Sequence, residues 1–223
     1  ADSSAELVLP LALSIVYQDE YLIVIDKPAG LLSVPGRRYF SQDSVMSRLR
    51  YQLPNCSFLE AVHRLDQATS GLIVIATCEK ANRNLSRKFA ERKVSKRYEA
   101  ILSRPVVGFE SGSVGTIDLP ILKQGENKMR QVVDIERGKP SKTRFKVLVA
   151  SSRPKVEFVP HTGRTHQIRV HAAHVEGLNA PILGDELYGK KGQEGRLLLH
   201  ATRLKFLHPH TKRVLRFSST APF

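Results

Sequence analysis

Two short runs of consecutive apolar residues mark the first half of the chain. Leu22–Ile25 is rich in β-branched residues and ends at the turn-forming stretch Asp26–Gly30, and Gly71–Ala76 is a second run of the same kind. Because neighbouring side chains of a strand point to opposite faces of a sheet, runs that are apolar at every position predict strands buried on both faces. We therefore expect a sheet whose central strands are covered on two sides.

Helical spacing follows each of these runs. The apolar positions Val45, Leu49 and Leu53 predict a helix over 44–53 that ends before a proline, with Ser41 or Ser44 as its N-cap. A second helix is predicted over 79–91. The first half of the chain thus alternates strand and helix.

The second half changes to shorter strands separated by glycine and proline, with one helix beginning near Thr165. The predicted strands are Arg97–Leu102, Arg130–Ile135, Thr143–Ala150, Lys155–Val159, Arg196–His200, Leu204–Leu207 and Val214–Phe217. No internal repeat, low-complexity tract or linker interrupts the pattern. We predict an α+β (α/β-like) fold with a mixed, largely antiparallel central sheet and flanking helices, in a single domain of two lobes over residues 1–223.

The charge balance points to a polyanionic partner. The 223 residues include 35 Lys and Arg against 21 Asp and Glu, for a formal net charge of +14. The region 83–104 alone holds eight basic and two acidic residues, a density that favours phosphate contacts. A basic surface without a ligand is the alternative, and the clustering favours RNA.

Several classes of protein are disfavoured by what the sequence lacks. It has no apolar run long enough to span a membrane and no secretory leader, so we expect an intracellular protein without membrane attachment. Two cysteines are too few for a disulfide framework, and the glycine-rich phosphate loops of nucleotide-binding proteins are absent. His161, His166 and His171 are spaced by five residues, which does not place them on one helix face, so no metal site is expected.

The polar segment His63–Gly71 stands directly before the second buried run. In it, Asp66 lies two residues after Arg64, and a carboxylate beside a guanidinium can stay ionised in a partly dry pocket and act as nucleophile or base. The alternative is structural: Asp66 caps a turn and Arg64 pairs with it.

A second polar segment, Thr162–His171, begins the last predicted helix. Its first turns carry Arg164, His166 and Arg169. Because the N-terminus of a helix is already electropositive, basic residues there are unfavourable unless an anion lies nearby. We expect such a group close to this segment.

Taken together, the motifs resemble the RluA family of RNA pseudouridine synthases in their order and spacing over nearly the whole chain. The segments that carry the resemblance are Asp26–Gly30, His63–Gly71, Lys96–Ala100, Gly163–His171, Gly184–Gly189 and Leu198–His200. Gly30–Arg37 is further similar to a subfamily whose members act on both large-subunit ribosomal RNA and tRNA. The segment Leu122–Lys128 does not resemble the equivalent loop of that subfamily, which leaves the substrate open.

The resemblance implies a role for individual residues. Asp66 corresponds to the nucleophile, Tyr98 to the pocket residue that takes the C5 proton, and Arg169 to the partner of the catalytic carboxylate. Arg64 corresponds to the arginine that enters the space left by a flipped nucleotide. The other residues expected to contact RNA or the base are His63, Thr69, Arg164, His166, Ile168 and Leu199, with Arg87, Lys88, Arg92 and Lys93 on phosphates.

The implied reaction breaks the N1–C1′ bond of uridine and forms a C5–C1′ bond, with no redox change and no cofactor or metal. The carboxylate can attack C6, attack C1′ or remove a ribose proton, and the sequence does not select among these routes. The resemblance also implies a cytoplasmic monomer that acts on ribosomal RNA, tRNA or both, with a cleft for RNA across a single catalytic domain. No segment of this chain corresponds to the N-terminal S4 domain of many relatives.

Two other functions remain open from the residues. One is an RNA-binding or assembly factor that has lost catalysis, which Asp66, Tyr98 and Arg169 disfavour. The other is a glycoside-cleaving enzyme, which needs a second catalytic carboxylate that the sequence does not identify. Convergence of Asp66, Tyr98 and Arg169 in one basic cleft is the structural test of the enzymatic hypothesis.

Overall fold

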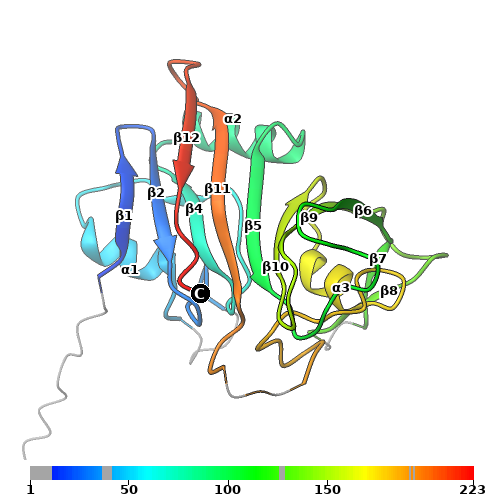
Figure 1. Ribbon diagram of the computed structural model, residues 1–223. Helices are drawn as coiled ribbons and strands as arrows, with labels where there is room; N and C mark the ends of the chain where they lie inside the picture. The colour runs from blue at the N-terminus through cyan, green and yellow to red at the C-terminus, as the bar shows by residue number, and fades with distance from the viewer. Residues whose placement is uncertain (1–11, 37–41, 126–128, 191, 193) are drawn as a thin grey trace, which may run out of the picture.

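One large sheet organises the molecule (Figure 1). The computed structural model describes residues 12–36, 42–125, 129–190, 192 and 194–223. Ten strands form the sheet, in the order β1-β2-β4-β11-β5-β10-β9-β6, with β12 on β11 and β3 on β4. Their bounds are β1 (Ser14–Gln18), β2 (Leu22–Lys27), β3 (Glu60–Ala61), β4 (Ser70–Ala76), β5 (Ser95–Ile101), β6 (Val114–Asp118), β9 (Lys142–Val149), β10 (Lys155–Pro160), β11 (Leu199–Leu207) and β12 (Val214–Ser218).

Smaller elements complete the described part of the chain. The helices are α1 (Val45–Gln52), α2 (Glu79–Ala90) and α3 (Gln167–Ala173), and β7 (Ile121–Lys123) pairs with β8 (Gln131–Val133) in a separate ribbon. Among the described residues, no helix is both long and apolar enough to cross a membrane.

The strands β2 and β4 lie in the middle of the first half, as their apolar runs predict. On one face, Ile23 and Ile75 pack in a cluster with Leu49 of α1. On the other face, Val24 packs in a cluster with Leu85 of α2. Burial of every β4 side chain on one of these two faces explains why the strand has no polar alternation.

A third apolar cluster fills the second half, around α3. It joins Phe158 of β10 and Phe145 of β9 to Ile168 of α3, and it continues to Leu199 of β11. Tyr98 of β5 packs against this cluster and also against the cluster of α1. The middle strands therefore connect the two halves, and Tyr98 lies at their junction.

The parallel pairing of β4 with β11 depends on one glycine. His200 pairs with Ser70, and Ala201 pairs with Gly71, while all other strand pairs of the sheet are antiparallel. Gly71 has φ of +110°, and a Cβ at this position would overlap the backbone of Ala201. Only glycine therefore permits β11 to approach the start of β4, which directly follows the Asp66 segment.

The predicted α+β class with a mixed, largely antiparallel sheet is confirmed. Ser44 is the N-cap of α1, with a capping box to Ser47, whereas Ser41 lies outside the described residues. The prediction of two separate strands at 196–200 and 204–207 was wrong. One strand, β11, runs through both segments, with a register shift between Ala201 and Arg203.

Other strands were shorter than expected or not expected at all. β8 ends at Val133, before Asp134, whose side chain accepts hydrogen bonds from the following turn. The edge strands β1 and β6 were not predicted from sequence. Most of their side chains are exposed, so neither has a continuous apolar run to reveal it.

Candidate active site

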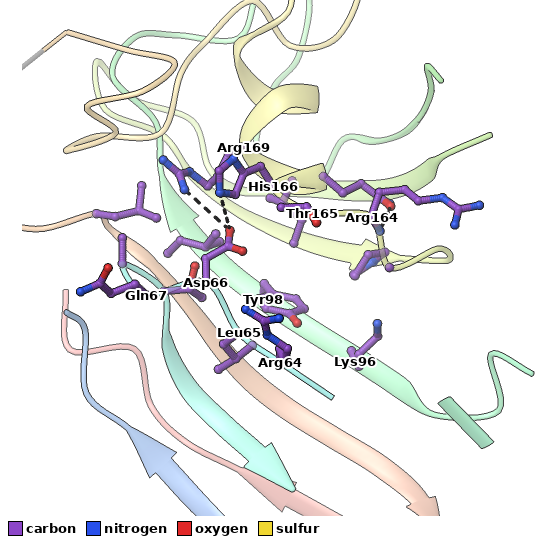
Figure 2. A pocket seen from close by; sticks show the side chains of 18 of the residues that line it. Arg64, Leu65, Asp66, Gln67, Lys96, Tyr98, Arg164, Thr165, His166 and Arg169 are labelled. Carbon is purple, nitrogen blue, oxygen red and sulfur yellow. Dashed lines mark hydrogen bonds and ion pairs between the residues drawn. The ribbon is translucent and has the colours of Figure 1, made fainter. Parts of the chain in front are cut away.

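A cleft of about 1590 Å³ opens at the junction of the two halves, and Figure 2 shows residues that line it. Its walls come from the segment before β4, the segment after α2, strand β5, the start of α3 and the segment before β11. Of the residues singled out in the sequence, those lining it are His63, Arg64, Asp66, Thr69, Arg92, Lys93, Tyr98, Arg164, His166, Ile168, Arg169 and Leu199. His63 and Leu199, which are 136 positions apart in the chain, therefore line the same cleft.

Asp66 lies on a turn just before β4. The Thr69 N–H donates to the backbone carbonyl of Asp66 at 3.0 Å, so the main chain closes the turn and the side chain is left for other contacts. That side chain is 26% exposed and reaches into the cleft. Arg64, expected in the structural alternative to pair with it, is itself exposed at the cleft and has no carboxylate partner among the described residues.

A buried lysine, Lys27, hydrogen-bonds backbone carbonyls around the turn that carries Asp66. Nζ of Lys27 donates to the carbonyls of Leu31 at 2.7 Å, Pro28 at 2.9 Å and Gln67 at 3.1 Å. Burial lowers the pKa of Lys27 to about 7, against the opposing charge of Asp66. Since Gln67 directly follows Asp66, this lysine connects the turn that carries Asp66 to the end of β2. Sequence reasoning did not single it out, although its motif was part of the resemblance.

Arg169 reaches Asp66 from α3, but its main partner is another carboxylate. Its Nη1 lies 3.7 Å from Oδ2 of Asp66, whereas Nε and Nη2 donate to Asp185 at 2.8 and 2.7 Å. Arg169 thus lies within ion-pair distance of Asp66, as expected, and its shorter contacts to Asp185 were not expected. Burial lowers the pKa of Arg169, but Asp185 and Asp66 outweigh burial and raise it, so the guanidinium stays charged.

Asp185 is the anion that the basic start of α3 requires. Its side chain is 0% exposed, and its Oδ1 also accepts the N–H groups of Leu187 and Tyr188. Asp185 was not among the candidate site residues. With both oxygens engaged and outside the cleft lining, it supports Arg169 and is not placed to act as a second catalytic carboxylate.

Tyr98 forms part of the cleft floor on β5, below Asp66 in the view of Figure 2. Burial and the negative charge of Asp66 raise the pKa of Tyr98, so the side chain is a neutral phenol. Its hydroxyl makes no hydrogen bond to the part of the chain that the structure describes, which leaves it available to a bound base. Ile168 and Leu199 are buried and supply apolar wall.

His63 has a structural role in addition to its place at the cleft. Its Nε2 accepts the N–H of Val74 at 3.0 Å, and its ring stacks on Phe89 with centroids 4.3 Å apart. Burial, together with the charge of Lys96, lowers the pKa of His63 to about 3. The ring is thus neutral and anchors the Asp66 segment to β4 and α2.

Several basic residues line the cleft. Arg92, Lys93 and Arg164 line the cleft, together with Lys96 and Arg196, which sequence reasoning did not single out. Arg87 and Lys88 lie on α2 outside the lining, so their expected phosphate contacts stay a prediction. The exposed members of this set are available to a polyanion that enters the cleft.

Histidines within this region make separate contacts. The ring of His166 hydrogen-bonds Tyr188, and that of His171 contacts Thr143 and the carbonyl of Leu119. Within the ranges described, no group of three or more His, Cys, Asp or Glu is arranged to hold a metal ion.

Comparisons with known proteins, by sequence and by structure, find the same family. The family model described as RNA pseudouridylate synthase matches residues 21–174. The chain is 42% identical over 216 residues to the dual-specificity RNA pseudouridine synthase RluA of Escherichia coli (strain K12), covering 95% of this chain and 94% of that protein. The protein of the same name from Haemophilus influenzae is 41% identical with the same coverage.

Solved structures are similar over nearly the whole chain. Human RNA Pseudouridylate Synthase Domain Containing 1 matches with a TM-score of 0.77 and 30% identity, covering 95% of this chain and 84% of that one. Human RNA Pseudouridylate Synthase Domain Containing 4 matches with a TM-score of 0.75 and 26% identity, covering 94% and 88%.

Proposed function

Since the chain belongs to the RNA pseudouridylate synthase family and is an RNA pseudouridine synthase, we propose that it modifies uridines in ribosomal RNA and tRNA with Asp66 as its nucleophile. The name shared by its relatives, dual-specificity RNA pseudouridine synthase, supports two kinds of RNA substrate. We also propose that the protein acts in the cytoplasm, where both kinds of RNA function. The reading as an inactive binding factor is not favoured.

The observation that carries the proposal is the position of Arg169 Nη1, 3.7 Å from Oδ2 of Asp66, in the cleft that Tyr98 also lines. The Arg169 guanidinium stays charged and is held by two hydrogen bonds to Asp185, so it stabilises the Asp66 carboxylate from 3.7 Å without moving closer to it. Asp66 thus meets the requirement for a nucleophile in a partly dry pocket.

The reaction exchanges one glycosidic bond for another. The N1–C1′ bond breaks, the C5–C1′ bond forms, the hydrogen on C5 is lost as a proton, and N1 gains a proton. An ionised Asp66 can begin this sequence by attack on C6, by attack on C1′ or by removal of a ribose proton, and the geometry of the free protein is compatible with all three. In each case the charge of Arg169 stabilises the carboxylate before and after the step.

Tyr98 enters the reaction as a neutral phenol, because burial and the charge of Asp66 raise its pKa. Its oxygen can accept the C5 proton only as the phenol passes its own proton to a base. We assign that base to the Asp66 carboxylate, whose negative charge already raises the pKa of Tyr98. In the routes through C1′ or a ribose proton, the carboxylate is free again once the C5–C1′ bond has formed. In the route through C6, loss of the C5 proton breaks the bond between C6 and Asp66, and the carboxylate released in that step takes the phenol proton.

The target uridine must leave its stack to reach Asp66, at a cost of a few kcal/mol. Arg64, exposed at the cleft and without a carboxylate partner among the described residues, fits the proposed role of filling the vacated space. Arg92, Lys93 and Arg164 fit contacts with the flanking phosphates.

We further propose that one copy of the chain acts as a single catalytic domain of two lobes, with the cleft between them. The continuous sheet and the contribution of every site residue by one chain support this arrangement.

The experiment is tritium release from RNA that carries 5-³H-uridine, with transcripts of large-subunit ribosomal RNA fragments and of tRNA assayed separately. Release from both, stoichiometric with one uridine per molecule, is the expected result. Release from only one transcript would overturn the dual specificity, and release from neither would overturn the proposed substrates.

A further inference from the structure

A tyrosine from outside the cleft lining contacts the ring of His166. The backbone N–H of Gln131 on β8 donates to Oη of Tyr188 at 2.8 Å, and the same oxygen lies 2.8 Å from Nδ1 of His166. A phenol has one hydrogen to donate. Among the described residues, Nδ1 of His166 is the only acceptor in contact with that hydroxyl, so the tyrosine hydrogen points to Nδ1.

An Nδ1 that accepts a hydrogen bond leaves the ring hydrogen of a neutral imidazole on Nε2. Burial lowers the pKa of His166, and the opposing charge of Asp66 does not restore it, so the ring is neutral near pH 7. The ring is also held in place, because it packs edge-on against Tyr188 with centroids 5.6 Å apart. His166 itself caps α3 with a left-handed backbone, φ +55°.

The fixed hydrogen on Nε2 faces the catalytic carboxylate. Nε2 lies 3.9 Å from Oδ2 of Asp66, and Nη1 of Arg169 lies 3.7 Å from the same oxygen (Figure 2). Oδ1 of Asp66 has no partner in the part of the chain that the structure describes. Two donors thus flank one carboxylate oxygen and leave the other toward the substrate.

We propose that His166 is a positioning residue for Asp66: held by Tyr188 with its hydrogen on Nε2, it shares Oδ2 of Asp66 with Arg169 and leaves Oδ1 to react with uridine. This inference rests on the proposed function, in which Asp66 is the nucleophile. The distances from Oδ2 of Asp66 to Nε2 of His166 and to Nη1 of Arg169 are too long for hydrogen bonds in the free protein. In this proposal both shorten when RNA fills the cleft, as catalytic contacts commonly do.

A second donor fixes the orientation of the Asp66 carboxylate. A carboxylate held by one donor can rotate about Cβ–Cγ, so that either oxygen, or neither, faces the base. A second donor with a fixed hydrogen makes one orientation dominant before the substrate arrives, and this raises the turnover number without changing the affinity for RNA.

Two substitutions at His166 separate positioning from a merely structural role. In His166→Gln the amide nitrogen occupies the place of Nε2 and still donates to Asp66. In His166→Asn the shorter side chain reaches only the place of Nδ1, where its oxygen accepts from Tyr188, and the donor to Asp66 is lost. Asn tolerates a left-handed backbone better than Gln, so a purely structural role predicts that Asn is the better replacement.

We expect the opposite order in single-turnover assays. His166→Gln should stay within about 3-fold of the wild-type rate, and His166→Asn should lose about 10- to 100-fold, the range for a lost hydrogen bond to a charged group. The RNA Kd should be unchanged in both. The matched control is His210→Gln, because His210 is exposed, stacks on Tyr21 and lies outside the cleft lining. Asn equal to or faster than Gln overturns the inference.

A second measurement does not depend on activity. Long-range ¹H–¹⁵N spectra of the free protein distinguish the two imidazole tautomers, and the His166 signals are assigned by their absence in His166→Gln. We expect the Nε2–H form in wild type and a mixture of tautomers in Tyr188→Phe. An Nδ1–H form in an active wild type overturns this inference alone, whereas a wild type inactive on every RNA overturns the proposed function together with it.

Discussion

Arg169 and Asp185 are joined by two parallel hydrogen bonds, from Nε to Oδ2 at 2.8 Å and from Nη2 to Oδ1 at 2.7 Å. Both side chains are almost fully buried, at 6% and 0% exposure. The pair fixes the plane of the guanidinium and directs only Nη1 toward Asp66. The arginine that contacts the Asp66 carboxylate is thus itself oriented by a second carboxylate, Asp185.

Asp185→Asn should therefore affect both stability and activity. The variant leaves Arg169 buried without its carboxylate, which should cost about 3–5 kcal/mol in the free energy of unfolding. Turnover should fall about 10-fold or more, because Nη1 of Arg169 is no longer held in position toward Asp66. Urea denaturation and single-turnover tritium release measure the two effects.

A matched control is the ion pair of Arg97 and Glu157, 3.0 Å long with Arg97 45% exposed. Glu157→Gln should cost less than about 1 kcal/mol and leave turnover unchanged. Equal losses in Asp185→Asn and Glu157→Gln would contradict the role assigned to Asp185.

His63 should make the protein less stable in acid. Its pKa is lowered from 6.5 to about 3 in the folded protein, so between these pH values the unfolded chain binds a proton at His63 that the folded chain does not. The free energy of unfolding should thus decrease as the pH falls through this window, by at most about 1.4 kcal/mol per pH unit from this group.

His63→Gln isolates this contribution, because its amide oxygen can still accept the N–H of Val74 while the side chain no longer titrates. Urea denaturation at intervals from pH 7 to pH 4 should give a steeper decline for the wild type than for the variant. Parallel curves would show that His63 does not titrate differently in the folded and unfolded states.

Arg92 and Arg87 are neighbours in the chain with different positions relative to the cleft. Arg92 lines it, whereas Arg87 lies on α2 outside the lining. Arg92→Gln should weaken RNA binding and reduce the slope of log K against log salt by about 0.7, the value for one contact with a single-stranded phosphate. Arg87→Gln should change the slope less. Equal effects, measured by filter binding from low to moderate salt, would argue against a phosphate path through the cleft.

Gly71→Ala should disrupt the sheet at the point where it supports Asp66. A Cβ at Gly71 overlaps the backbone of Ala201, and φ is +110°. We expect a loss of at least about 3 kcal/mol in the free energy of unfolding, whereas Gly108→Ala, with φ +81° and open space around it, should lose about 1 kcal/mol. Similar melting temperatures for the two variants would contradict the close approach of β4 and β11.

The hydrophobic pattern of the sequence predicted the strands that are buried on both faces and the helices with one apolar face. β2 and β4 are buried on both faces, and the helices α1 and α2 present apolar stripes to them, so each could be found from its own residues. β1 and β6 lie at the sheet edges with mostly exposed side chains, and their own residues carry too little apolar signal. The bulge in β11 depends on its partner β5, which local pattern does not reveal.

Most residues of the candidate site could be predicted from the sequence, but the hydrogen bonds between them could not. The motifs around Asp66, Tyr98 and Arg169 could be identified from the chain alone. Asp185 as the partner of Arg169, and Tyr188 as the partner of His166, depend on contacts across 16 and 22 residues that no local rule specifies. Lys27 was missed because a lysine in a turn motif gives no sign that it is completely buried.

The most direct test of the account compares Asp66→Asn with the wild type on one RNA, for binding and for chemistry. The asparagine has nearly the same shape as Asp66 but no nucleophilic carboxylate, so the two proteins should bind the RNA with Kd values within about 3-fold, a difference of under about 1 kcal/mol. In a single turnover with excess enzyme, the wild type should release the tritium from C5 of the target uridine and Asp66→Asn should release none. Tritium release by Asp66→Asn at a rate near that of the wild type would contradict the assignment of Asp66 as the nucleophile.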